Sequence, residues 1–163
     1  WTLAYHGHEG SALMLDGGFG QWTAEGRAIE EGAPTDPEAS TYVASLVEER
    51  RVDSTWVLDH LEDRTVTLFD ARSAGEYDGG HIPGAVNVNW NSTQSAGVFL
   101  AAEDLLALHG EPAADQTLVT YCQTGSRASV TWLVLAALGY EDVRLYDGSW
   151  AEWGSDPMLP SEP

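Results

Sequence analysis

The sequence contains no lysine and only seven arginines, against 26 aspartates and glutamates, so its formal net charge is −19. A chain with so few cations cannot neutralise many phosphates, which argues against nucleic acid as a partner. No apolar run approaches the roughly 20 residues that span a bilayer, and the first residues lack a signal pattern. We therefore expect a water-soluble protein with neither a nucleic acid nor a membrane partner.

The acidic surface also bears on the source of the protein. Its charges repel one another in dilute buffer, whereas near 1 M salt the Debye length falls to about 3 Å and screens the repulsion. We expect a cytoplasmic protein of a halophilic organism. An acidic protein from a genome whose codon bias replaces lysine by arginine is the alternative. Export stays open because Trp1 is not a natural start.

Cysteine is the next scarcity, because Cys122 is the only one in the chain. One cysteine excludes an internal disulfide and a metal site built from several thiolates. The histidines outside the motifs described below show no metal-ligand spacing apart from a weak His-Gly-His at residues 6–8; they are His6, His8, His60 and His109. We accordingly expect neither a metal nor a cofactor.

A short motif occurs twice in the chain. The stretch Asp16-Gly-Gly-Phe-Gly-Gln-Trp22 resembles Asp147-Gly-Ser-Trp-Ala-Glu-Trp153, which lies 131 positions later. This tandem repeat predicts that residues 1–26 are the last helix, strand and helix of a first domain copy. Residues 27–40 are rich in proline, glycine, alanine and acidic residues and are predicted to form a linker. Residues 41–163 then contain the second copy in full.

Short apolar strands alternate with helices in the second copy. The predicted strands span residues 65–69, 85–88, 117–121 and 143–146, and the predicted helices span 54–61, 73–77, 101–108, 126–138 and 149–153. This alternation is typical of an open, mostly parallel α/β sheet with helices on both faces. Ligands of such sheets bind beyond the carboxyl ends of the strands.

Cys122 directly follows one of these strands and opens a six-residue loop that ends at Arg127. A loop that leads into a helix directs backbone N–H groups and the helix dipole toward negative charge at its centre. Together with Arg127 they favour the thiolate form of Cys122, and Gly125 permits a positive φ. Cys122 is therefore predicted to be a nucleophile in an anion cradle. A small buried residue at a strand end is the alternative.

Four motifs together resemble a known family. They are Val119-Thr-Tyr-Cys-Gln-Thr-Gly-Ser-Arg-Ala-Ser129, Asp70-Ala-Arg-Ser-Ala-Gly-Glu-Tyr77, Gly80-His-Ile-Pro-Gly-Ala85 and Asp147-Gly-Ser-Trp-Ala-Glu-Trp153. In this order they resemble rhodaneses, specifically tandem-domain thiosulfate sulfurtransferases, over about residues 52–160. Residues 16–22 resemble the end of the family's inactive N-terminal domain. The resemblance implies a rhodanese-like fold and a two-step reaction. A thiolate takes a sulfane sulfur from thiosulfate, releases sulfite, and passes the sulfur to cyanide or another thiophile.

The resemblance implies that Cys122 is catalytic and that a further set of residues binds the substrate, namely Arg127, Gln123, Thr124, Gly125, Ser126, Arg72 and Ser149. It places structural residues near the site, namely Asp70, Glu76, His81 and Trp150. Some relatives carry a second cation where this chain has Glu76, so Arg127 and the backbone amides would carry most of the thiosulfate recognition.

Individual roles leave alternatives. We expect Arg72 to pair with Asp70 or Glu76 and to shape the floor of the pocket, either beside the substrate or as a purely structural ion pair. Ser149 either donates a hydrogen bond toward the sulfur or caps the helix that begins there. Trp150 packs two domains together or forms a wall of the pocket.

Other functions are weighed against the size of the loop. Dual-specificity phosphatases and arsenate reductases resemble the same fold but hold one more residue between cysteine and arginine, and the narrower loop here favours a lone sulfur. Mercaptopyruvate is the alternative donor, although enzymes that use it tend to lack the loop arginine. A sulfur-carrier or regulatory module that delivers the sulfur to a protein is a third possibility.

Residues 1–26 carry apolar side chains suited to a sheet and its helices, although the strands that would complete that sheet are not in the sequence. Exposed apolar surface is unfavourable by about 25 cal/mol per Å². We therefore expect a separate polypeptide, most simply an upstream fragment of the same precursor, to complete this segment. An incomplete or truncated chain is the alternative. The remaining expected partners are a small-molecule sulfur donor and a sulfur acceptor.

Overall fold

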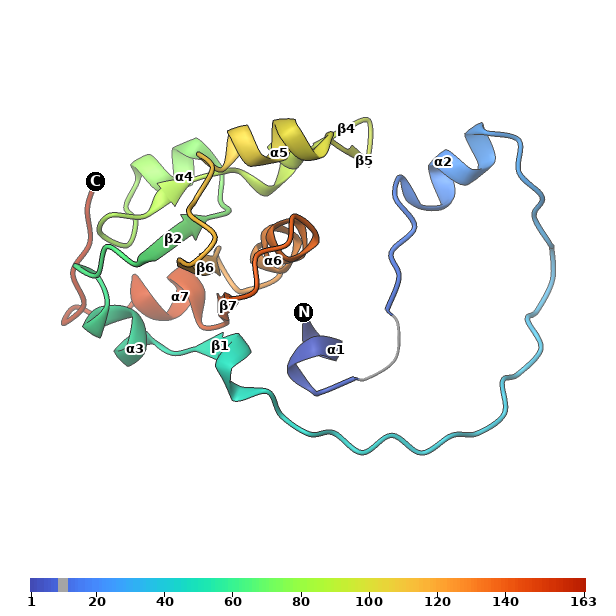
Figure 1. Cartoon of the computed structure of the whole chain (residues 1–163), viewed down its shortest axis with the longest axis horizontal. Coiled ribbons are helices and arrows are strands. Elements are labelled where there is room, and N and C mark those ends of the chain that lie inside the picture. The colour runs from blue at the N-terminus through green and yellow to red at the C-terminus, as the bar shows by residue number, and fades with distance from the viewer. Residues whose placement is uncertain (9–11) are drawn as a thin grey trace.

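The computed structural model describes residues 1–8 and 12–163 (Figure 1). Its main body is a five-stranded sheet in the order β1-β7-β6-β2-β3, in which every neighbouring pair is parallel. The strands are β1 (Arg51–Val52), β2 (Val66–Asp70), β3 (Val86–Asn87), β6 (Thr117–Tyr121) and β7 (Val143–Tyr146). The predicted mostly parallel α/β sheet is confirmed.

Helices cover both faces of the sheet, and each face has its own core cluster. One face is covered by α1 (Thr2–Tyr5), α5 (Ala102–Leu108) and α6 (Ala128–Ala137). The other is covered by α3 (Ser54–Asp59), α4 (Ala74–Asp78) and α7 (Ser149–Trp153). The predicted helices and strands of the second copy are all present, with ends within two residues of the expected ones.

Strand β6 shows why this sequence needs cover on both sides. Leu118 belongs to the cluster under α6, and the next residue, Val119, belongs to the cluster under α3 and α7. Both side chains are completely buried. Successive strand residues point to opposite faces, and full burial of each such side chain contributes about 1.5–3 kcal/mol. An apolar run without alternation therefore forms the central strand.

Two short features were not predicted. Strand β1 contains two residues, and a hairpin joins β4 (Gln94–Ser95) to β5 (Val98–Phe99) through Ala96 and Gly97. Both turn residues have positive φ, 52° and 82°. A two-residue hairpin turn of this type usually carries Asn-Gly or Asp-Gly, so Ala-Gly gave no clear signal. The 3₁₀ turns η1 (Glu48–Arg50) and η2 (Trp90–Thr93) complete the regular structure of this part.

The N-terminal segment differs from the expected domain remnant. It contains α1 and α2 (Gly18–Ala24), but residues 12–15 form no strand, and residues 9–11 lie outside the described part of the chain. A strand needs a neighbour for its hydrogen bonds, and none of the described segments pairs with residues 12–15. Residues 27–47 contain no helix or strand, so the irregular connection is longer than the predicted linker.

The end of this connection is nevertheless attached to the first helix. The N–H of Ser45 donates to the carbonyl of His6 at 3.0 Å, and the N–H of Val47 donates to that of Tyr5 at 2.8 Å. Trp1 packs against the cluster under α6 and donates its indole N–H to the carbonyl of Arg50. Helix α1 is therefore part of the main body, whereas α2 lies apart from the sheet (Figure 1).

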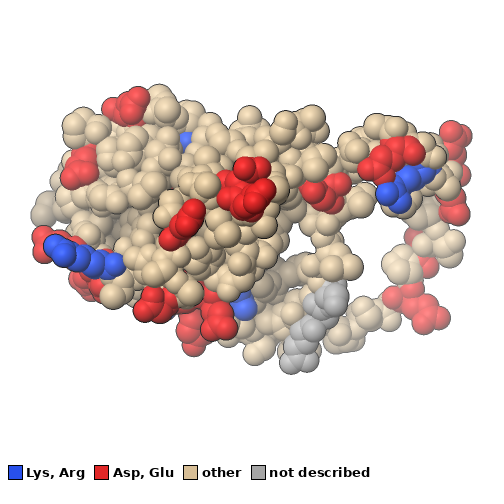
Figure 2. Space-filling model, turned by 45° about the horizontal axis from the view of Figure 1, so that its top comes forward, with Lys and Arg blue, Asp and Glu red and all other residues tan. Residues whose placement is uncertain are grey.

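Acidic side chains are scattered over the face drawn in Figure 2, where few basic ones are visible. Among the described residues, none of the helices has the length and apolar character needed to cross a membrane.

Candidate active site

Cys122 is the first residue after β6, at the carboxyl end of the middle strand of the sheet. Its side chain exposes 1% of its surface and belongs to the same core cluster as Ala71, Val88 and Ala128. The two interpretations of this residue, a nucleophile or a small buried residue, are thus compatible. Cys122 is a buried residue at a strand end, and it also opens the loop that leads into α6.

Two carbonyl groups of the loop of residues 122–127 accept hydrogen bonds from α7. The carbonyl of Cys122 accepts a hydrogen bond from the N–H of Trp150 at 3.0 Å, and that of Gln123 accepts one from Ala151 at 2.9 Å. Both donors lie in the first turn of α7. Within the described chain, acceptors are lacking for a set of backbone N–H groups at the loop and the start of α6, namely Gln123, Thr124, Ser126, Arg127 and Ala128. Unpaired N–H groups in such a loop form a nest for an anion.

The Ser149 hydroxyl binds this loop through two hydrogen bonds, and its proton is not directed at the Cys122 sulfur. Its buried hydroxyl accepts from the N–H of Cys122 at 3.2 Å and of Gly125 at 3.0 Å, and donates its proton to the carbonyl of Tyr146 at 2.9 Å. The N-cap of α7 is Gly148, without a side-chain cap. The expected hydrogen bond from Ser149 to the sulfur is therefore absent, because its single proton is donated to Tyr146, and the expected helix cap is absent because the N-cap position is taken by Gly148.

Two residues of the site require backbone conformations that few residues adopt. Gly125 has φ +81°, which confirms the expected positive φ, and a Cβ placed on it would lie 2.8 Å from Asp147 Oδ1, so a side chain here would be strained and would displace Asp147. Ser149 has φ +54°, which is uncommon for a residue other than glycine. Its counterpart in the repeated motif is Gly18, with φ +59°.

Arg127 is bound to Glu76 through both of its terminal amino groups. Nη1 donates to Oε2 at 2.8 Å and Nη2 donates to Oε1 at 2.7 Å. Glu76 also accepts from the N–H of Ser73 at 3.1 Å and from its hydroxyl at 2.7 Å, which completes the capping box of α4. The expected arginine of the site is present, but it is paired with a carboxylate rather than free for an anionic substrate.

Electrostatics reflect this pairing. The hydrogen bonds from Arg127, and after them that from Ser73, hold the pKa of Glu76 well below its usual range. The hydrogen bond to Glu76 in turn raises the pKa of Arg127, with smaller contributions from the neighbouring Cys122 side chain. Arg127 is thus held mainly by the carboxylate of Glu76.

Arg72 is buried beside the site and makes its contacts with other parts of the protein. Its Nη2 donates to Asp70 Oδ2 at 2.6 Å and to the carbonyl of Gly80 at 2.8 Å, and its side chain is 1% exposed. The ring of Trp150 lies over its guanidinium, 4.6 Å from the ring centroid. Assignment of Arg72 to substrate binding is therefore corrected. Of the two expected partners it takes Asp70, and it supports the floor on which Trp150 packs.

His81 is also held by structural contacts. Its Nδ1 lies 3.0 Å from the carbonyl of Tyr77, and its ring stacks on that of Tyr77 with centroids 3.6 Å apart. Its backbone forms a bridge with Glu162, which ties the C-terminal residues to the loop after α4. Among the described residues, no group of three or more histidine, cysteine or acidic side chains is arranged to hold a metal ion.

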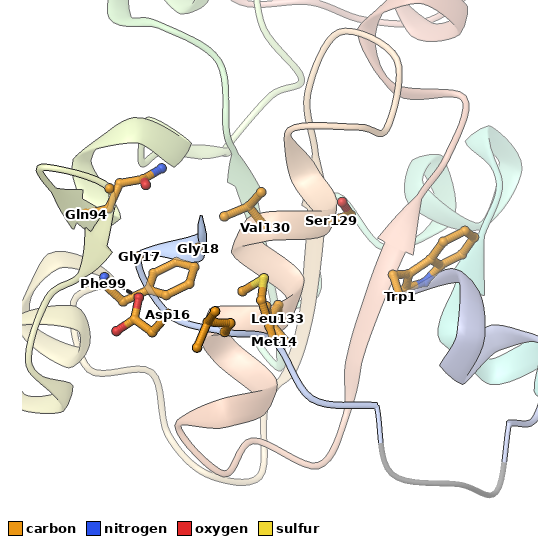
Figure 3. A pocket seen from close by; sticks show the side chains of 12 residues that line it. Trp1, Met14, Asp16, Gly17, Gly18, Gln94, Phe99, Ser129, Val130 and Leu133 are labelled. Atoms are coloured by element: carbon orange, nitrogen blue, oxygen red, sulfur yellow. Dashed lines mark hydrogen bonds between the residues drawn. The ribbon is translucent and has the colours of Figure 1, made fainter. Parts of the chain in front are cut away.

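A separate groove of about 640 Å³ runs beside α6 (Figure 3). Its apolar walls include Met14, Phe99 and Leu133, and Asp16 accepts a hydrogen bond from the N–H of Phe99 at 3.0 Å. Neither Cys122 nor Arg127 lines this groove. The groove lies between the N-terminal segment and the β4–β5 hairpin, and it is distinct from the nest.

Comparison with known proteins agrees with this arrangement. Residues 53–156 match the Rhodanese-like domain family, and they include the whole parallel sheet apart from β1 together with the nest. The chain belongs to the rhodanese-like family. A thiosulfate sulfurtransferase of Corynebacterium glutamicum is 36% identical, over 99% of this chain and 60% of the relative. A putative thiosulfate sulfurtransferase of Haloferax volcanii is 33% identical, over 99% of the chain and 63% of the relative.

Other similar proteins have different names. The sulfur carrier protein TtuD of Thermus thermophilus is 36% identical, over 98% of this chain and 64% of its own. Among solved structures, SseA from Escherichia coli, described as a 3-mercaptopyruvate sulfotransferase, has a TM-score of 0.77 at 32% identity and is matched over 92% of this chain and 60% of its own. EanB in complex with hercynine has a TM-score of 0.84 at 26% identity, over 97% and 42%. The rhodanese-like chain thus spans less than two thirds of these relatives.

Several contacts of the site were not predicted from the sequence. The N–H groups of Trp150 and Ala151 were not expected to bind the loop, and Glu76 was not expected to bind Arg127. The sequence did carry a signal for the position of the Glu76 carboxylate. Ser73-Ala-Gly-Glu76 has the spacing of a capping box, which directs that carboxylate to the start of its own helix. Backbone donors in α7 leave no such trace, since any residue supplies an N–H group.

Proposed function

We propose that the protein is a sulfurtransferase in which Cys122 takes a sulfane sulfur from thiosulfate and passes it to cyanide or another thiophile. The Cys122 thiolate attacks the outer sulfur of thiosulfate, the S–S bond breaks, and sulfite leaves with the electron pair. Cyanide then attacks the outer sulfur of the Cys122 persulfide, thiocyanate forms, and the thiolate is restored. Neither step needs an external oxidant or reductant.

The nest around Cys122 is the observation that carries this proposal. Two of its carbonyl groups are bonded to α7, and the N–H groups of Gln123, Thr124, Ser126 and Arg127 have no acceptor in the described chain, so it favours a negatively charged atom at the end of the Cys122 side chain. A persulfide anion places its charge on such an atom. The loop between Cys122 and Arg127 is also short, which suits a lone sulfur better than a phosphate with its full set of oxygens.

Turnover with two donors tests the proposal. With cyanide as the acceptor, the protein is expected to form thiocyanate from thiosulfate and, less efficiently, from mercaptopyruvate. A clear preference for mercaptopyruvate would overturn the assignment of the donor. Hydrolysis of aryl phosphates, with neither sulfur donor used, would overturn the sulfurtransferase function itself.

Mercaptopyruvate is the second candidate donor, and the pairing of Arg127 with Glu76 favours it. In that reaction the thiolate attacks the sulfur of mercaptopyruvate, the C–S bond breaks, and the electron pair remains on carbon as an enolate that takes up a proton to give pyruvate. The donor carries one negative charge near neutral pH, whereas thiosulfate carries two. The fold similarity to SseA supports this candidate.

A sulfur-carrier role concerns the second step rather than the first. Similarity to the sulfur carrier protein TtuD supports transfer from the same persulfide to an acceptor protein. Transfer to cyanide would then be slow relative to transfer to that acceptor. Loading of Cys122 with sulfur is common to all three candidates, so the proposed nucleophile does not depend on the choice.

We also propose that further polypeptide covers the N-terminal segment. Leu13 is 93% exposed and Phe19 is 67% exposed, and Met14, which is 56% exposed, lines the apolar groove seen in Figure 3. Exposure of such large apolar side chains is unfavourable in water. An upstream fragment of the same precursor is the simplest cover. The native protein is then expected to give a second band in a denaturing gel, and a soluble 17.6 kDa monomer alone would contradict this.

A further inference from the structure

The nest favours negative charge, yet a carboxylate lies beside it. Glu76 projects from α4, 51 residues before Arg127 in the sequence, and binds both terminal amino groups of that arginine. The Arg127 side chain is 29% exposed and that of Glu76 is 36% exposed, so the pair is accessible to solvent. A ligand that approaches the loop therefore meets a paired charge rather than a free cation.

This pairing has different consequences for donors of different charge. A dianion gains most from a free guanidinium, which binds two oxygens at once, and it loses most from a nearby carboxylate. With Arg127 occupied end-on by Glu76, a dianion must either displace the carboxylate or bind beside it. A monoanion of the same shape loses less in either case, because the repulsion scales with its charge.

We propose that Glu76 is a specificity-determining residue, which competes with the sulfur donor for Arg127 and thereby weakens the binding of doubly charged donors more than that of singly charged ones. This inference rests on the proposed sulfurtransferase function. It assigns the selection of donor charge to a residue of α4, outside the loop that carries the nucleophile.

The Glu76→Gln variant removes the charge and keeps the shape. Glutamine is accepted at this position of a capping box, so the contact with the Ser73 N–H can be retained. The ion pair that is lost is partly exposed, and such pairs contribute little to stability. The variant is therefore expected to fold, and Glu76→Asp, which keeps the charge, serves as a second variant.

A matched control exists at the other end of the sheet. Asp142 and Arg144 form a pair at 2.7 Å with similar exposure, 41% and 23%. Asp142 precedes the first residue of β7, so it lies opposite the carboxyl ends where Cys122 is found. Asp142→Asn makes the same change in net charge as Glu76→Gln, so it reports any effect of overall charge alone.

Two donors that differ in charge complete the experiment. Thiosulfate is a dianion, and methanethiosulfonate is a monoanion whose sulfane sulfur is also bonded to a sulfonyl sulfur. Attack on it breaks the same kind of S–S bond and releases methanesulfinate with the electron pair. The KM and kcat of each donor are measured with cyanide for the unmodified protein and for the three variants.

Glu76→Gln is expected to lower the KM for thiosulfate about five- to tenfold and that for methanethiosulfonate only about two- to threefold, with little change in kcat. Glu76→Asp and Asp142→Asn are expected to keep the original ratio of the two KM values. Equal changes for both donors, or the same shift in Asp142→Asn, would overturn the inference while leaving the sulfurtransferase function intact. An unmodified protein that uses neither donor would overturn both this inference and the assignment of thiosulfate as the donor.

Discussion

Two arginine–carboxylate pairs lie near the carboxyl end of the sheet, and they differ mainly in burial. Arg72 and Asp70 expose 1% and 0% of their side chains, whereas Arg127 and Glu76 expose 29% and 36%. A buried pair is costly to break because it leaves a charge without a partner, while an exposed pair is screened by water. The same two chemical groups therefore support the floor in one place and remain accessible to a ligand in the other.

The same substitution at both arginines gives the largest contrast. Arg72→Met leaves the Asp70 carboxylate buried and unpaired, and we expect it to lower the free energy of unfolding by about 3–5 kcal/mol. Arg127→Met should lower it by no more than about 1 kcal/mol. Urea denaturation of the two variants checks this. Similar losses at the two positions would show that burial does not separate the pairs.

Substitution of Ser149 tests how the loop of residues 122–127 is held in place. Ser149→Ala removes the acceptor of two buried N–H groups, those of Cys122 and Gly125. We expect a loss of about 1–3 kcal/mol in the free energy of unfolding and a lower kcat, because each unpaired buried donor is costly and the nest is no longer fixed. Retention of full stability and turnover would mean that the backbone N–H groups of Trp150 and Ala151 are enough to hold the loop.

Arg127 is expected to affect activity more than stability. Arg127→Met leaves Glu76 without its partner beside the nest, so the negative charge there is no longer balanced. The kcat/KM for thiosulfate should fall by about tenfold or more, since a charge-assisted contact is lost and a repulsive one is gained. Combining it with Glu76→Gln should restore part of the loss. Unchanged turnover in the single variant would place Arg127 outside the donor site.

The pH dependence of the exposed pair is the smallest effect. Because Arg127 holds the pKa of folded Glu76 below its ordinary value of 4.5, the stabilisation is present above that pH and decreases as the pH falls below it. The difference in unfolding temperature between the unmodified protein and Glu76→Gln should therefore shrink from neutral pH to about pH 3.5. A difference that is constant over this range would contradict the pairing.

The sequence predicted the framework of the site better than its contacts. An apolar strand followed by Cys122 and a glycine-containing loop indicated where the proposed nucleophile lies, because strand ends and helix starts are local features. The partners of Arg72 were left as Asp70 or Glu76, since both lie within reach along the chain. The choice depends on the tertiary contact between α4 and the loop that ends at Arg127, which places Glu76 against Arg127 and leaves Asp70 for Arg72.

Ser149 was misassigned for a similar reason. A hydroxyl at the first position of a helix is commonly a cap, and a hydroxyl near a thiolate is commonly a donor to it. Its bonds to the N–H groups of Cys122 and Gly125 require the start of α7 to meet a loop that lies 24 to 27 residues earlier in the sequence. Such tertiary contacts carry no period or spacing that the sequence alone reveals.

Intact-mass measurement tests most directly whether Cys122 carries the sulfur. The unmodified protein and Cys122→Ser are incubated with thiosulfate or mercaptopyruvate, weighed, and then treated with cyanide. The unmodified protein should gain the mass of one sulfur atom from at least one donor and lose it to cyanide, while Cys122→Ser should gain nothing. Equal gain by the variant, or no gain by the unmodified protein from either donor, would contradict the proposed persulfide.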